Sequence, residues 1–152
     1  MSKTLSVSAI HNGTVIDHIH SDQTLRIIRM LHLLEKKLKV TVGFNLPSKT
    51  MEVKDLIKIE NHILTHDEAN QITIFAPDAT INIIQDFEVK QKIITSLPAT
   101  ISHIFICPNI NCITHDEPVH SFFTVAEEGK STQLICRYCE KSFERNQMKV
   151  AI

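Results

Sequence analysis

All four cysteines of this chain lie in its last third, in two closely spaced pairs. Cys107 and Cys112 form a C-x4-C pair, and Cys136 and Cys139 form a C-x2-C pair after a spacer of 23 residues. Two thiol pairs at this separation are typical of a zinc site in which each pair lies on a tight turn. Four thiolates fill the tetrahedral positions of zinc and leave none for a substrate water, so we expect one structural zinc ion.

The spacing of the cysteines also predicts where the chain divides. A segment of about 50 residues has too little core to fold alone, so the metal is expected to supply much of its stability. Leu97-Pro98 is the expected linker, because proline cannot join the interior of a helix or ladder. The predicted domains are therefore residues 1–98 and 99–152. The nearby histidines are alternative ligands, although a solvated loop position is expected for each: His103, His115 and His120.

Composition excludes several classes of function. The 152 residues include 16 Lys plus Arg against 17 Asp plus Glu, so no basic face for nucleic acid is expected. No apolar stretch is long enough to cross a bilayer and the first residues do not resemble a secretory signal, so we expect a cytoplasmic protein. No Gly-rich phosphate loop or nucleophile elbow occurs, and an enzyme is not expected.

The first domain alternates strand-like and helix-like segments. A helix is predicted over residues 22–37, beginning after Ser21, with an apolar side that includes Leu25, Ile28, Leu31 and Leu34. The capping box of Thr65 and Glu68 opens a short second helix. Residues 46–49 are expected to form a turn. Strands are predicted over residues 5–10, 14–19, 40–45, 55–63, 72–75, 80–84 and 88–94.

This order of segments predicts an α+β protein. The first domain is expected to be a ferredoxin-like α/β sandwich, an antiparallel-rich sheet with two helices on one face. The second is expected to be a small all-β domain of the zinc-ribbon or rubredoxin-like kind. Its short strands are predicted over residues 101–106, 121–125, 133–136 and 142–145.

Polar residues interrupt the apolar strands of the first domain. Alternation on a half-solvated strand explains much of this pattern. The other interpretation is a polar cluster for an anionic ligand, in which lysines contact phosphates and a carboxylate contacts ribose hydroxyls. The residues concerned are Asp17, His18, Lys58, Asn82, Lys90 and Lys92.

Five strings and their order carry a resemblance to a known family. They are GTVIDHI at 13–19, GFNLPS at 43–48, KDLIKIEN at 54–61, CPNINC at 107–112 and CRYCEK at 136–141. With Leu97-Pro98, they resemble the regulatory chain of aspartate carbamoyltransferase over about residues 5–150. The resemblance implies a non-catalytic subunit of an enzyme of pyrimidine biosynthesis. Its first domain would bind CTP, UTP or ATP and pair two regulatory chains, and its zinc domain would dock onto a separate catalytic chain.

The resemblance also implies the nucleotide contacts. Asp17 and Lys58 correspond to ribose and base contacts, and His18 and Lys92 to the phosphate side. The base would contact the side chains or backbone groups of Ile10, Phe87 and Val89, and the pocket would be completed by Val15, Asn82 and Ile84. Ser8 and Phe87 depart from the family, which often has an acidic residue and a tyrosine there.

Other functions are compatible with a zinc ribbon. A nucleic-acid-binding module would place Lys and Arg near the metal, but residues 99–152 carry five basic and six acidic side chains. A protein-interaction module is the other alternative. A stand-alone zinc hydrolase would need an open coordination position and a general base, which four thiolates do not provide.

Overall fold

The computed structural model describes residues 9–151, which divide into two compact units. The first ends at Ser96 and the second begins at Leu97. Within the described residues, no helix has the length and apolar character needed to cross a membrane.

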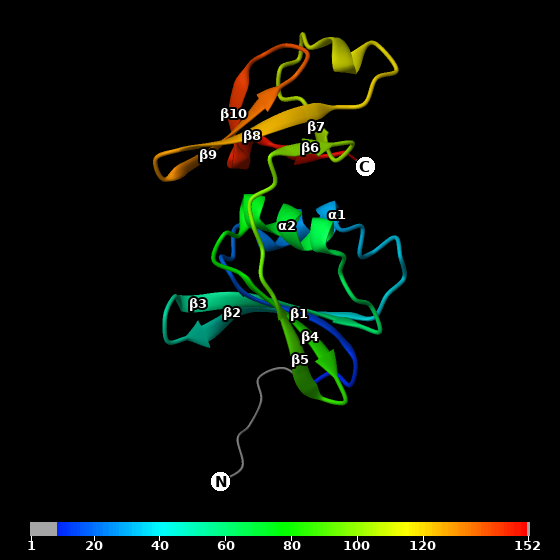
Figure 1. Ribbon diagram of the computed structural model, residues 1–152, viewed down its shortest axis with the longest axis vertical. Coiled ribbons are helices and arrows are strands. Elements are labelled where there is room, and N and C mark those ends of the chain that lie inside the picture. The colour runs from blue at the N-terminus through cyan, green and yellow to red at the C-terminus, as the bar shows by residue number, and fades with distance from the viewer. Residues whose placement is uncertain (1–8, 152) are drawn as a thin grey trace. The chain divides into compact units, whose positions relative to one another are not determined.

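The N-terminal unit is a five-stranded sheet with two helices on one face (Figure 1). Its strands pair antiparallel in the order β2-β3-β1-β4-β5. The first four strands and both helices have the β-α-β-β-α-β order of a ferredoxin-like fold, which confirms the prediction. The elements are β1 (Gly13–Ile19), α1 (Thr24–Met30), β2 (Val40–Ser48), β3 (Glu52–Glu60), α2 (His66–Phe75), β4 (Thr80–Gln85) and β5 (Glu88–Ile93).

The two faces of this sheet differ in character. Ile16, Ile57 and Ile81 lie in the central strands and are at most 1% exposed, because their side chains pack beneath the helices. Successive residues of a strand point to opposite faces. Their neighbours Val15, Lys58 and Asn82 therefore lie on the face opposite the helices.

The first helix is shorter than predicted, and of its predicted apolar side Ile28 and Leu31 are buried. It spans Thr24–Met30 instead of residues 22–37, and its N-cap is Gln23, without a side-chain cap, instead of Ser21. Leu25 and Leu34, predicted on the apolar side, are 61% and 76% exposed. Apolar residues stand on most sides of this segment, so spacing alone did not identify the buried side. The buried residues are Ile27, Ile28, Met30, Leu31 and Leu33.

The predicted strand over residues 72–75 is wrong, because these residues end α2. The predicted capping box is present: Glu68 N donates to Thr65 Oγ1 at 3.1 Å, and Thr65 N donates to Glu68 Oε1 at 3.1 Å. The cap starts the helix, and burial of Ile72, Ile74 and Phe75 overrides the strand preference of the β-branched residues.

Other boundaries shift by a few residues. β2 continues through residues 46–48, where a turn was expected, and the edge position of this strand tolerates Pro47. β3 spans Glu52–Glu60 instead of 55–63. Of the predicted strand over 5–10, residues 5–8 lie outside the described part of the chain, and residues 9 and 10 are not in a strand.

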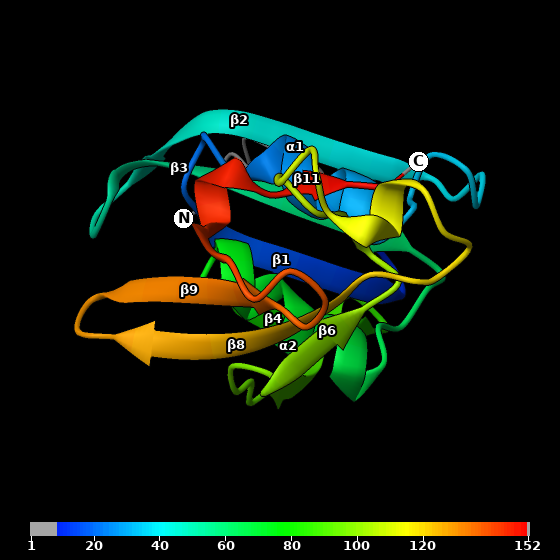
Figure 2. The same ribbon diagram turned by 90° about the horizontal axis from the view of Figure 1, so that it is seen from above.

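The C-terminal unit is a small all-β domain, as predicted. A four-stranded sheet has the order β10-β9-β8-β6, and β11 pairs with β7. β8 and β9 form its long hairpin (Figure 2). The predicted strand over 101–106 is broken at His103, whose backbone is left-handed with φ of 69°. The elements are β6 (Thr100–Ser102), β7 (Phe105–Ile106), η1 (Ile113–His115), β8 (Phe122–Glu128), β9 (Ser131–Cys136), β10 (Ser142–Glu144), η2 (Arg145–Gln147) and β11 (Lys149–Val150).

Candidate ligand pocket and metal centre

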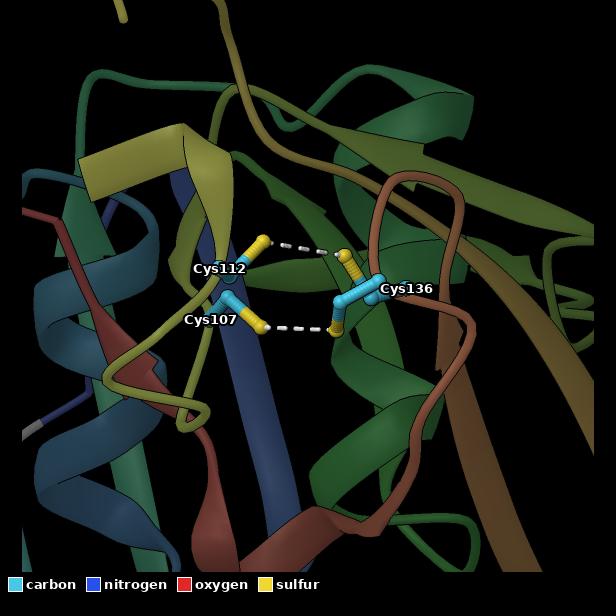
Figure 3. A group of neighbouring side chains, drawn as sticks. Cys107, Cys112 and Cys136 are labelled. Atoms are coloured by element: carbon cyan, nitrogen blue, oxygen red, sulfur yellow. Dashed lines mark hydrogen bonds between the residues drawn. The ribbon is translucent and has the colours of Figure 1, made fainter. Parts of the chain in front are cut away.

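Two tight turns of the C-terminal unit bring the four cysteines together. In the first turn, Cys112 N donates to Asn109 O at 3.0 Å. In the second, Glu140 N donates to Cys136 O at 2.9 Å, and the left-handed φ of 61° at Glu140 closes the turn. The thiols of Cys107 and Cys112 point toward those of the second turn (Figure 3).

The sulfur positions fit a tetrahedral metal ion. All four Sγ atoms lie within 4.8 Å of one another, and the Cys107–Cys139 and Cys112–Cys136 sulfur pairs are each 3.7 Å apart. An ion about 2.3 Å from each of four sulfurs would hold them about 3.8 Å apart. The cluster can therefore close around one ion without rearrangement of its turns.

The environments of the thiols differ. Burial raises the pKa of the Cys107 and Cys136 thiols. Burial also opposes ionisation of Cys139, but hydrogen bonds from the Asn109 side chain and the Lys141 backbone outweigh it and lower the pKa of this thiol to about 7.

The histidines near the cluster do not join it. Among residues 9–151, the groups able to hold a metal consist of the four cysteines alone. His115 Nε2 lies 2.9 Å from Cys107 O, and the rings of His103 and His120 stack on each other at 4.1 Å. Thr114 Oγ1 donates to Cys112 Sγ at 3.2 Å, so a hydroxyl supports one of the sulfurs from outside the cluster.

The N-terminal unit carries a hollow of about 460 Å³ on the sheet face opposite the helices. This volume lies within the range of about 300–1,000 Å³ that is usual for ligand pockets. Eight of the predicted nucleotide contacts line it: Ile10, Val15, Asp17, Lys58, Asn82, Ile84, Phe87 and Val89.

Strand register places the polar residues of this face in one row. Across the sheet, Lys58 of β3 pairs with Val15 of β1, Val15 with Asn82 of β4, and Asn82 with Lys92 of β5. Directly paired residues share a face, so Lys92 belongs to the same face although it does not line the hollow. His18 does not line it either, and its Nδ1 lies 3.1 Å from Thr80 Oγ1.

Asp17, which lines the hollow, is held in place by Lys54 and by the backbone of His18. Lys54 Nζ lies 3.0 Å from both of its carboxylate oxygens, and His18 N donates to Oδ1 at 2.7 Å. Burial lowers the pKa of the Lys58 ammonium, although the charge of Asp17 opposes this shift. The hollow therefore combines a carboxylate and lysines with apolar walls, and can bind an anionic ligand that also has an apolar part.

Five residues of the lining were not predicted from the sequence. Lys54 is the main omission, because it pairs with Asp17 and sets its orientation. The alternation of Lys54, Leu56 and Lys58 along one strand was a sufficient signal, since a period of two places them on one face. The other missed residues are Ala9, Leu46, Pro47 and Leu56.

Comparisons with known proteins cover both units. Residues 5–96 match the family described as aspartate carbamoyltransferase regulatory chain, allosteric domain, and residues 99–149 match the metal binding domain of the same regulatory chain.

Similar proteins named aspartate carbamoyltransferase regulatory chain occur in several bacteria. The one from Tolumonas auensis is 52% identical over 143 residues, covering 94% of this chain and 93% of its own. Those from Aeromonas hydrophila and Chromobacterium violaceum are 49% and 48% identical, covering 93% and 96% of this chain and 92% and 96% of their own. This chain therefore belongs to the family of aspartate carbamoyltransferase regulatory chains, and it is a non-catalytic subunit.

Proposed function

We propose that the hollow of the N-terminal unit binds nucleotide effectors and that the chain passes their effect to separate catalytic chains of aspartate carbamoyltransferase. CTP acts as the inhibitor, helped by UTP, and ATP acts as the activator in the same hollow. The chain works in the cytoplasm, in pyrimidine biosynthesis, and pairs with a second regulatory chain.

One observation carries this proposal: a single face of the sheet, in and beside the hollow, gathers the chemical groups that bind the parts of a nucleotide. Asp17 and Lys58 offer polar contacts to the ribose and the base, while Lys92, further along the same row, offers charge to phosphates. Apolar side chains such as Ile10 and Val89 supply walls for the base. We assign His18, outside the hollow, to the phosphate side together with Lys92.

We further propose that the four-cysteine cluster holds zinc. A tetrahedral set of four sulfurs suits zinc or iron, and the closed set leaves no position for catalysis. The ion organises the C-terminal unit, which docks onto the catalytic chain. Elemental analysis of the purified chain should find one zinc and no iron per chain, and a stoichiometric iron content would contradict this assignment.

Calorimetric titration of CTP into the full chain tests the nucleotide site. Lys58→Ala and Lys92→Ala should each weaken CTP binding by roughly ten- to a hundredfold, since each removes one charge-assisted contact. Lys90→Ala is the matched control, because Lys90 lies on β5, outside the hollow, beside Glu88 at 3.7 Å. Wild-type affinity in both test variants would place the nucleotide elsewhere.

A further inference from the structure

Asp55 is a charged residue in the middle of β3 that neither unit's proposed chemistry uses. It is fully buried, at 0% exposed, on the helix side of the sheet, away from the hollow. Its Oδ1 accepts a hydrogen bond from Asn45 N at 2.9 Å, and its Oδ2 accepts one from the hydroxyl of Thr24, the first residue of α1. Burial of a carboxylate is costly, so contacts that stabilise it also hold their donors firmly.

The two strands that flank β3 both contain a bulge at this level. On β2, pairing passes from Gly43↔Leu56 to Leu46↔Lys54, so two β2 residues face Asp55 alone. On β1, pairing passes from Ile16↔Ile57 to Ile19↔Asp55. The extra residue of a bulge leaves a backbone group outside the ladder.

Each bulge uses an aspartate to satisfy a backbone N–H. Asp55 accepts from Asn45 N in the β2 bulge, and Asp17 accepts from His18 N in the β1 bulge at 2.7 Å. Asn45 and His18 both have left-handed backbones, with φ of 55° and 61°. For residues other than glycine this conformation has a cost, which such contacts offset.

The β2 bulge decides which side chains face the hollow. A one-residue change of register sends every following side chain to the other face of the sheet. With the bulge, Leu46 pairs with Lys54, and both line the hollow. Without it, Asn45 would pair with Lys54, and Leu46 would point toward the helices.

We infer that Asp55 is a positioning residue for the effector pocket: from the opposite side of the sheet, it holds the bulge that turns Leu46 into the hollow and anchors that bulge to the start of α1. This inference rests on the proposed nucleotide function of the hollow. Asp55 makes no contact with the ligand and acts through β2.

Three substitutions at two positions test the inference by CTP calorimetry on the full chain. Asp55→Leu removes both acceptors and should weaken CTP binding by about tenfold, the effect of one lost hydrogen-bonded contact. Asp55→Asn keeps an acceptor for Asn45 N and should restore affinity to within about threefold of wild type. Leu46→Ala in the Asp55→Leu background should lower CTP affinity little further, because without the bulge the Leu46 side chain no longer lines the hollow.

The matched control is Lys92→Ala. Lys92 lies on β5, the edge strand farthest from β2, so this substitution should lower CTP affinity by the same factor in the wild-type and Asp55→Leu backgrounds. Asp55→Ser serves if the leucine variant does not fold, since serine is too short to reach Asn45 and Thr24 together. Full additivity of the position 55 and position 46 substitutions would overturn the inference. Wild-type affinity in a folded Asp55→Leu variant would also overturn it, whereas absence of CTP binding to the wild-type chain would instead refute the proposed function.

Discussion

The two units of this chain are stabilised in different ways. Among residues 9–151, the N-terminal unit buries twenty apolar residues, whereas the C-terminal unit buries nine, three of them cysteines. Burial of a large aliphatic side chain contributes about 1.5–3 kcal/mol, so the first unit has a conventional core and the second does not. A domain of that size is marginally stable on its core alone, and a metal or disulfides commonly add to its stability.

Because of this difference, the N-terminal unit is suited to ligand binding and the C-terminal unit to metal binding. The N-terminal unit can present a ligand pocket on one sheet face because the other face forms a packed core beneath the helices. In the C-terminal unit the buried cysteines hold a metal, and short loops surround that metal. Ligand binding and metal binding should therefore respond independently to substitution.

The largest expected effect is loss of the metal centre. Cys139→Ala should unfold residues 99–151 while residues 9–96 stay folded, because structural zinc contributes about 10–16 kcal/mol in small zinc domains. Loss of amide resonances confined to the C-terminal unit in a nitrogen–proton correlation spectrum would show this. Lys130→Ala, in the exposed turn between β8 and β9, is the control that should change nothing. A variant that keeps all C-terminal resonances would contradict the metal-based account.

A core substitution should affect the other unit alone. Ile57 is 0% exposed beneath the helices, and Ile57→Ala should lower the free energy of unfolding of the N-terminal unit by about 2–5 kcal/mol. Val53→Ala, on the same strand at 44% exposed, should have an effect below about 1 kcal/mol. Urea denaturation monitored separately in each unit measures this difference. Equal destabilisation of both units would show that they share a core.

The linker should affect how CTP binding in the N-terminal unit changes the activity of the catalytic chains, and should not affect CTP affinity itself. Ser96 N donates to Asn70 Oδ1 of α2, and Val125 N of β8 donates to Ala99 O, so each unit anchors its own end and Leu97-Pro98 lies between. Inserting Gly-Ser-Gly after Leu97 should leave CTP affinity and metal content unchanged. In the reconstituted enzyme it should reduce the effect of CTP on aspartate saturation, because an allosteric coupling of about 1–3 kcal/mol requires a stiff joint.

The same insertion after Gly129, in the exposed β8–β9 turn, is the control that should preserve inhibition. Inhibition at full strength through the Leu97 insertion would mean that direct contacts between domains carry the coupling.

The smallest expected effect concerns the start of α2. Thr65→Ala should cost about 1 kcal/mol by removing the cap. Burial opposes ionisation of Glu68, but hydrogen bonds from Thr65 and the charge of Lys36 lower the pKa of its carboxyl. A lowered folded-state pKa stabilises the fold at pH above the unfolded value near 4.5, and this contribution is lost as pH falls through the folded value. Glu68→Gln should therefore be destabilising at pH 7 in thermal unfolding, and this effect should shrink as the pH falls below about 4.5.

Sequence patterns predicted the features that depend on local chemistry. Fixed spacing identified the cysteine turns, and the capping box identified the start of α2. Sequence patterns failed where tertiary packing determines the structure. The side of α1 that is buried depends on the sheet beneath it, and Ile72–Phe75 reads as a strand until the helix that ends there is known.

The bulges show the same limit within the ligand pocket. Period-two alternation places Lys54 and Lys58 on one face, and this signal was available from the sequence. The register change that sends Leu46 to that face is invisible to alternation, because it lies in a bulge whose backbone bonds to a buried aspartate on the neighbouring strand.

The most direct test of the two-unit account is CTP titration of the full chain before and after its metal is removed with a chelator. The account predicts that the C-terminal resonances collapse while CTP affinity changes by less than about threefold, since a core of its own holds the pocket. Loss of CTP binding together with the metal would contradict it, because the pocket would then depend on the unit that the metal holds.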